Sequence, residues 1–101
     1  PVVSIAAPGD GQSFQRTSPI FLLGTAVDTD RTTQNVTLRW AVQWASAPET
    51  TIGSASTFNW TPSTHVPFHC GGRNVKLRLY ATDPDGTAMD EITIFLHDPP
   101  C

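Results

Sequence analysis

Hydrophobic and polar residues alternate along most of this chain with the period of two that is typical of β-strands. The clearest stretch is residues 36–44, where large apolar side chains share one face: Val36, Leu38, Trp40, Val42 and Trp44. Shorter stretches of the same kind are closed by turns rich in Gly, Pro, Asp or Ser. The pattern predicts strands at residues 2–6, 20–27, 36–44, 51–53, 57–61, 75–82 and 91–96.

About seven short strands, with turn signals roughly every 8–12 residues and no helical apolar repeat, are the signature of an immunoglobulin-like β-sandwich. We expect an all-β fold with antiparallel strands in two sheets and Greek-key order, in which residues 62–74 cross between the sheets. Residues 1–101 then form a single domain, which we interpret as excised from a longer multidomain protein. The inward positions predict the core: Ile5, Leu22, Leu38, Trp40, Val42, Phe58, Trp60, Val75, Leu77, Leu79, Ile92 and Ile94.

Short motifs also carry a resemblance to a known family. In chain order they are Val3-Ser4-Ile5, Pro8, Asp10-Gly11, Gly24-Thr25-Ala26, Asp28, Asp30, Val36, Trp40 and Ala81-Thr82-Asp83-Pro84-Asp85-Gly86. The chain resembles the PKD-like and cadherin-like immunoglobulin modules of secreted and cell-surface proteins, many of them bacterial. Two features depart from that family: residues 68–73 replace the usual Gly-His segment, and the Gly-Asp-Gly of strict PKD domains is missing.

The two cysteines lie where the predicted strand order brings them together. Residues 75–82 run up to the turn at 83–86 and residues 91–96 run back, so Cys101 returns to the end that holds Cys70. A disulfide between them closes a loop of about 30 residues and fits an oxidising compartment. Two alternatives stay open: free thiols, or zinc held by both cysteines with His69 and His97, although the spacing does not match a zinc finger.

Four aspartates are expected to converge at the other end of the domain: Asp28, Asp30, Asp83 and Asp85. They follow two strands whose loops share one end of an immunoglobulin topology. Carboxylates brought together without a lysine repel one another, and a hard cation such as Ca²⁺ relieves that repulsion. The resemblance to cadherin-like modules, whose Asp-rich ends bind calcium, favours the same hypothesis. The alternative is structural, because Asp-Pro-Asp-Gly forms a type I turn on propensity alone.

The outward face of one sheet offers a candidate ligand-binding site. Arg78, Tyr80 and Phe95 are predicted to share this exposed face, with Tyr80 beside Phe95. Such a pair of aromatic rings is a candidate platform for stacking a sugar or for docking a neighbouring domain. The alternative is a cross-strand contact that stiffens the sheet.

Composition narrows the classes of function. The chain has six Lys+Arg against nine Asp+Glu and a net charge of −3, so it lacks the basic patch of a nucleic-acid binder or of a protein that binds anionic membranes. No apolar run reaches the roughly 18 residues of a membrane span. A catalytic triad is not expected, because His65 and His69 lie in the connection away from the acidic end.

We therefore predict a non-catalytic, extracellular module of a secreted or cell-surface protein. The module serves as a spacer, presentation or adhesion domain within the multidomain chain. It requires no cofactor, with calcium as the one candidate, and its partners are neighbouring domains and a surface protein or glycan. The alternative is a ligand-binding module for a glycan or protein, in which Tyr80→Ala or Asp85→Ala abolishes binding. Two N-glycosylation sequons, at Asn35 and Asn59, fall on outward positions and matter in a host that secretes through an endoplasmic reticulum.

Overall fold

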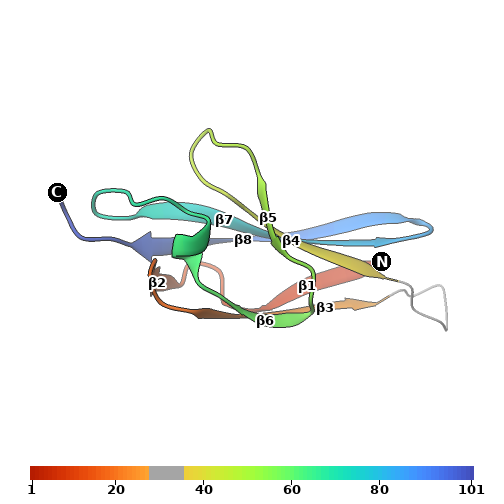
Figure 1. Ribbon diagram of the computed structural model, residues 1–101. Coiled ribbons are helices and arrows are strands. Elements are labelled where there is room, and N and C mark those ends of the chain that lie inside the picture. The colour runs from red at the N-terminus through yellow and green to blue at the C-terminus, as the bar shows by residue number, and fades with distance from the viewer. Residues whose placement is uncertain (28–35) are drawn as a thin grey trace.

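Two β-sheets pack face to face in the computed structural model, which describes residues 1–27 and 36–101 (Figure 1). The strands are β1 Val2–Ala7, β2 Ser13–Gln15, β3 Ile20–Val27, β4 Thr37–Gln43, β5 Thr50–Gly53, β6 Thr57–Trp60, β7 Arg73–Asp83 and β8 Gly86–His97, and a short 3₁₀ helix, η1, covers Pro62–Thr64. The smaller sheet has the order β1-β3-β6, and the larger one the order β2-β8-β7-β4-β5. Within residues 1–27 and 36–101, no helix has the length and apolar character needed to cross a membrane.

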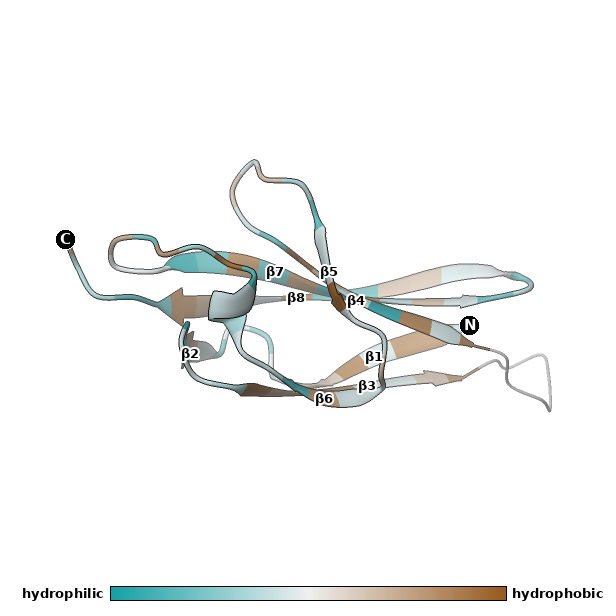
Figure 2. Cartoon of the chain, in the orientation of Figure 1, coloured by the Kyte–Doolittle hydropathy of each residue, from teal (hydrophilic) through white to brown (hydrophobic). Residues whose placement is uncertain are grey.

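The all-β architecture with two sheets confirms the coarse prediction from the sequence. The connection between β6 and β7 carries the chain from the smaller sheet to the larger one, as expected, although it ends before Arg73, where β7 begins. The β7–β8 hairpin is longer than predicted: its pairing runs from Arg73 opposite Leu96 up to Asp83 opposite Gly86. Apolar stretches recur along the strands of both sheets, whereas the turn between β7 and β8 is hydrophilic (Figure 2).

The prediction that all strands are antiparallel is wrong at β2, which pairs with β8 in parallel. Three residues are too few to show an alternating pattern, so the sequence did not mark this strand. Backbone hydrogen bonds on either side guide it to the edge of β8: the Gly11 amide donates to the Thr93 carbonyl at 2.7 Å, and the Arg16 amide donates to the His97 carbonyl at 3.1 Å. The smaller sheet and the larger sheet are thus linked through the first 16 residues of the chain.

The hydrophobic core lies between the two sheets. Ten of the twelve residues predicted for the core are buried, and the other two, Leu38 and Phe58, are partly buried against it. The alternating pattern missed Ile20, Val66 and Leu96, which lie at strand ends or in the connection after η1. It also missed Ala41, which faces outward but is fully buried, because Arg78 and Thr51 on the adjoining strands flank its methyl group.

A carboxylate from the larger sheet closes the outer edge of β1. The strand pairs with β3, and the Ile5 amide donates to Asp90 Oδ2 at 2.8 Å. An exposed strand edge is a template for pairing with another chain, and a charged side chain placed there blocks such pairing.

Replacing Asp90 tests this edge contact. Asp90→Ala leaves the part-buried Ile5 amide without its acceptor, so we expect the free energy of unfolding to fall by about 1–2 kcal/mol. Urea denaturation followed by tryptophan fluorescence measures the change. Asp90→Asn keeps an acceptor oxygen and is expected to lose less; an equal loss in both variants would contradict the role of the hydrogen bond.

The molecule is elongated. Its principal extents are 53 × 24 × 20 Å, and the N- and C-termini lie toward opposite ends of the long axis (Figure 1). Because the strands of both sheets run along this axis, the β7–β8 turn and the Cys70–Cys101 pair mark its two ends.

Candidate functional site

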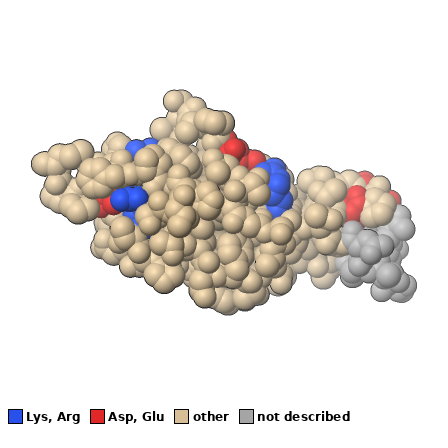
Figure 3. All heavy atoms as spheres, viewed as in Figure 1, with Lys and Arg blue, Asp and Glu red and all other residues tan. Residues whose placement is uncertain are grey.

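Charged side chains meet at one place on the outward face of the larger sheet. We call this group the Glu49 cluster: Arg39 of β4, Glu49 before β5, Arg78 and Tyr80 of β7, and Glu91 of β8. Strand register assembles it, because Arg39 lies opposite Tyr80 and Arg78 lies opposite Glu91. Elsewhere on the face shown in Figure 3, charge is confined to a few small patches and most of the surface is uncharged.

The Glu49 carboxylate holds the cluster together. Its Oε2 accepts hydrogen bonds from the Tyr80 hydroxyl at 2.6 Å and from Arg78 Nη1 at 2.9 Å. Its Oε1 accepts one from Arg39 Nη1 at 3.1 Å. The Arg78 Nε also donates to Glu91 at 2.7 Å, and the Arg39 guanidinium carbon lies 4.3 Å from the centre of the Tyr80 ring.

These contacts shift the pKa values of the cluster. The pKa of Glu49 is lowered, because the Tyr80 hydroxyl and then the two guanidinium groups donate to its charged form, against a partial desolvation. The pKa of Tyr80 is raised, mainly by its hydrogen bond to Glu49. The pKa of Arg78 is raised by its hydrogen bonds to Glu91 and Glu49. Each shift favours the ion-paired state near neutral pH.

The pH dependence of stability follows from these directions. A lowered carboxyl pKa adds stability above about pH 4.3, the ordinary value for Glu, and this contribution is lost as the pH falls through the lowered pKa of folded Glu49. A raised phenol pKa adds stability below about pH 10, and this contribution is lost as the pH rises through the raised pKa of folded Tyr80. The cluster is therefore expected to be intact across the neutral range.

Glu49→Gln tests the cluster directly. The amide keeps the shape of the side chain but removes the charge that holds Arg39 and Arg78, so we expect a loss of about 1–2 kcal/mol in the free energy of unfolding at pH 7. The loss should shrink as the pH falls through the lowered pKa of folded Glu49, because the wild-type carboxylate then becomes protonated as well. Glu91→Gln is the matched control: it removes one contact of an exposed side chain and should cost less than about 1 kcal/mol. Equal losses for both variants would contradict a central role for Glu49.

One feature of the predicted ligand-binding site is wrong, namely the placement of Tyr80 beside Phe95. Tyr80 lies opposite Met89 and Phe95 lies opposite Asn74, so the two aromatic residues are six positions apart along the hairpin, or about 20 Å. Tyr80 therefore does not lie beside Phe95, and the Arg39 guanidinium already stacks on the Tyr80 ring. The two-residue loop between Asp83 and Gly86 sets this register, and that loop was visible in the sequence.

Phe95 belongs instead to the opposite end of the sheet. Its ring meets the His97 ring edge to face, with the centres 4.8 Å apart. A Cβ at Gly72 would lie 2.9 Å from Phe95 Cε2, and the φ of Gly72 is +91°. The ring is therefore half-buried beside the cysteine-containing loop and packs locally.

The disulfide between Cys70 and Cys101 is present, with the two Cα atoms 5.2 Å apart, which confirms the predicted pairing. Both sulfur atoms are bonded to each other, so neither the free-thiol nor the zinc alternative applies. Backbone contacts support the link, since the Gly71 amide donates to the Pro99 carbonyl at 3.0 Å.

At the same end of the molecule, the Asp98 side chain links the C-terminal segment to Arg16 and to His69. The carboxylate accepts hydrogen bonds from Arg16 Nε at 2.8 Å and from the His69 amide at 3.0 Å. Desolvation opposes ionisation, but the bonds from His69 and Arg16 outweigh it and lower the pKa of Asp98. Arg16 also donates to the Val66 carbonyl at 3.1 Å, so three separate segments meet at this pair.

Of the four aspartates in the calcium hypothesis, two lie among the described residues and two do not. Asp28 and Asp30 lie outside the described residues, as does Asn35 of the first sequon. Asp83 Oδ1 accepts hydrogen bonds from the Asp85 amide at 2.8 Å and the Gly86 amide at 3.1 Å, as the structural alternative requires of this turn. Within the part of the chain that the structure describes, no three His, Cys, Asp or Glu side chains are grouped to hold a metal.

Calcium binding therefore stays a prediction. The hypothesis predicts that millimolar Ca²⁺ raises the melting temperature, because binding to the folded state alone stabilises it. Differential scanning fluorimetry with Mg²⁺ as the control measures the effect. An unchanged melting temperature at millimolar Ca²⁺ would rule the hypothesis out.

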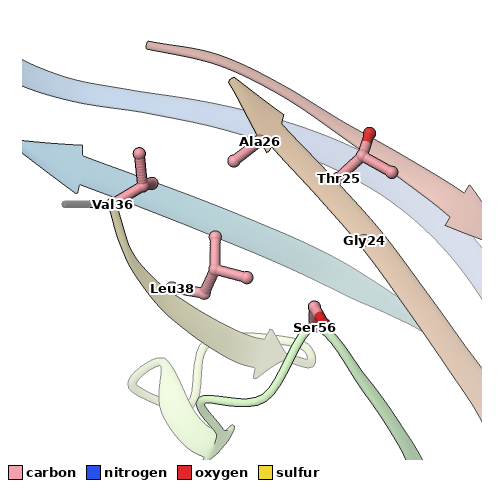
Figure 4. A pocket seen from close by; sticks show the side chains of 6 residues that line it. All are labelled: Gly24, Thr25, Ala26, Val36, Leu38 and Ser56. Atoms are coloured by element: carbon pink, nitrogen blue, oxygen red, sulfur yellow. The ribbon is translucent and has the colours of Figure 1, made fainter. Parts of the chain in front are cut away.

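A recess of about 390 Å³ opens between the end of β3 and the start of β4. Its described lining consists of Gly24, Thr25, Ala26, Val36, Leu38 and Ser56 (Figure 4). The side chains of Ala26, Val36 and Leu38 give it an aliphatic surface, and Thr25 and Ser56 add hydroxyl groups. The described lining of the recess therefore presents both apolar and hydroxyl groups.

Only Arg78 and Tyr80 of the cluster were predicted as site residues from the sequence, and the central residue, Glu49, was missed. Glu49 follows Pro48 in a segment between strands, where no alternating pattern assigns a face.

Comparison of the chain with protein-family models, with curated proteins and with solved structures finds no match.

Proposed function

We propose that this chain is an immunoglobulin-like module of a secreted or cell-surface protein, related to PKD-like and cadherin-like domains, which spaces and presents its neighbours without catalysis. The observation that carries the proposal is the shape: a two-sheet body 53 Å long with its termini toward opposite ends (Figure 1). A domain of this form would hold its neighbouring domains at a fixed separation.

The strand order supports the immunoglobulin-like assignment. In that fold the first, second, fourth and fifth strands form one sheet, and the third joins the last two in the other; here β5, at the fourth position, pairs instead with β4 in the larger sheet. Setting aside the short β2 and β5, the order β1-β3-β6 facing β4-β7-β8 follows this plan. A tryptophan in the centre of the third strand of the plan, Trp40 on β4, is fully buried, as in many such sandwiches.

The disulfide supports the extracellular part of the proposal. Disulfides persist in oxidising compartments and are rare in reducing ones. The low content of charged residues, 15%, fits a surface that relies on uncharged polar residues.

Two copies of the chain joined in tandem test the spacing role. Small-angle X-ray scattering should give a maximum dimension for the tandem that exceeds that of the single domain by about the length of the module, 53 Å. Two copies folded back side by side would contradict the proposal.

A binding screen distinguishes the spacing role from the alternative function, the binding of a glycan or protein ligand. A module that only spaces shows no saturable binding to a panel of glycans and matrix proteins. A hit would favour the ligand-binding alternative, and its dependence on Tyr80→Ala or Asp85→Ala would locate the site.

A further inference from the structure

The outward face of the smaller sheet carries no charge. The strands β1, β3 and β6 consist entirely of uncharged residues. Several apolar side chains on this face are unusually open to solvent: Val2 is 57% exposed, Phe21 49% and Val27 52%. Val2 and Val27 are cross-strand neighbours, whereas Phe21 lies six residues away along β3, so the exposed apolar side chains are spread along this face.

Asn59 lies on this face and within a glycosylation sequon, Asn59-Trp60-Thr61. Trp60 points into the core, where it is 3% exposed, so the strand alternation turns Asn59 outward, and its side chain is exposed. The strand that carries it, β6, is the last in the smaller sheet. An oligosaccharide attached there can leave the sheet at its open edge.

Phe21 is the cross-strand neighbour of Asn59. The two residues are directly paired between β3 and β6, so their side chains stand on the same face, with Cβ atoms about 4.5–5.5 Å apart. The face of a pyranose ring that carries axial C–H bonds is apolar and packs well against an aromatic ring. A sugar attached to Asn59 is therefore within reach of Phe21.

We propose that Asn59 carries an N-linked glycan whose first N-acetylglucosamine packs on Phe21 and covers part of the uncharged face. The donor is a lipid diphosphate-linked oligosaccharide of the secretory pathway. Asn59 Nδ2 bonds to C1 of the sugar and loses one proton, while the C1–O bond breaks and the lipid diphosphate leaves with its electron pair. This inference rests on the proposed extracellular function, because only a secreted chain meets that donor.

The first experiment secretes the full chain from a eukaryotic cell and treats it with a peptide:N-glycosidase. We expect the treatment to remove one glycan from position 59, with conversion of that asparagine to aspartate in the peptide mass spectrum. Asn59→Gln and Thr61→Ala should each lose this glycan, whereas Asn35→Gln, which removes the other sequon, should keep it. A folded, secreted chain with unmodified Asn59 would overturn the inference.

The second experiment tests the contact with Phe21. Removing the glycan should lower the melting temperature of the wild-type chain by about 2–5 °C, a shift measurable in a domain of this size. In Phe21→Ser, which keeps the sequon, removal should leave the melting temperature unchanged. Equal shifts in both chains would refute packing on Phe21. Neither failure touches the spacing role, which the tandem scattering experiment tests by itself.

Discussion

Trp40→Ala is expected to lower the free energy of unfolding by about 4–5 kcal/mol, at the upper end of the range for truncating a buried tryptophan. The side chain is fully buried and meets the Phe58 ring edge to face, with the centres 6.1 Å apart. Its Nε1 donates to the Ala55 carbonyl at 2.8 Å. A Cβ at Gly24 would lie 2.8 Å from Trp40 Cζ2, so the indole fills space that only a glycine leaves open.

Urea denaturation, followed by circular dichroism, measures this loss, and two variants separate its causes. Trp40→Phe keeps an aromatic ring but removes the hydrogen bond, and we expect a loss of about 1–3 kcal/mol. Trp44→Ala truncates a tryptophan that is only partly buried against the core, and it should cost less than Trp40→Ala. If Trp44→Ala costs as much as Trp40→Ala, then Trp40 is not the centre of the core.

Removal of the Cys70–Cys101 disulfide is the second large effect. In the chain-entropy model, a loop with a sequence separation of 31 residues contributes about 3–4 kcal/mol, because the link restricts the unfolded chain. This loop encloses the β7–β8 hairpin, the longest pair of strands in the fold. We expect the Cys70→Ser/Cys101→Ser double variant to melt about 15–25 °C below the wild-type chain.

Reduction offers an independent measurement of the same effect. Adding a thiol reductant should lower the melting temperature of the wild-type chain to that of the double variant, and it should leave the double variant unchanged. A wild-type melting temperature that is insensitive to full reduction, verified by thiol labelling, would show that the hydrogen bonds of Asp98 and Gly71 hold this end without the disulfide.

The disulfide could be predicted from the sequence because it depends on little more than the direction of two strands. The turn at residues 83–86 reverses the chain, and the length of each strand then determines which residues meet at the far end. The same turn also sets the strand register, in which Tyr80 lies opposite Met89. Counting pairs back from that turn would have separated Tyr80 from Phe95.

The Glu49 cluster could not be predicted in the same way. Glu49 is separated from Arg78 by 29 residues and from Tyr80 by 31 residues, and it lies outside any strand. Its position depends on how β5 pairs with β4 and on how β4 pairs with β7. No local pattern carries either register, because residues 44–49 between β4 and β5 hold no tight-turn motif and β4 is joined to β7 only through residues 44–72.

The sequence by itself determined where the strands other than β2 lie, which face of each enters the core and where the main hairpin turns. These features are local, since successive side chains of a strand point to opposite faces and a turn depends on a few consecutive residues. Only the tertiary structure decided the parallel pairing of β2 with β8 and the ion pairs around Glu49. Those contacts join distant segments, and their geometry depends on the packing of both sheets together.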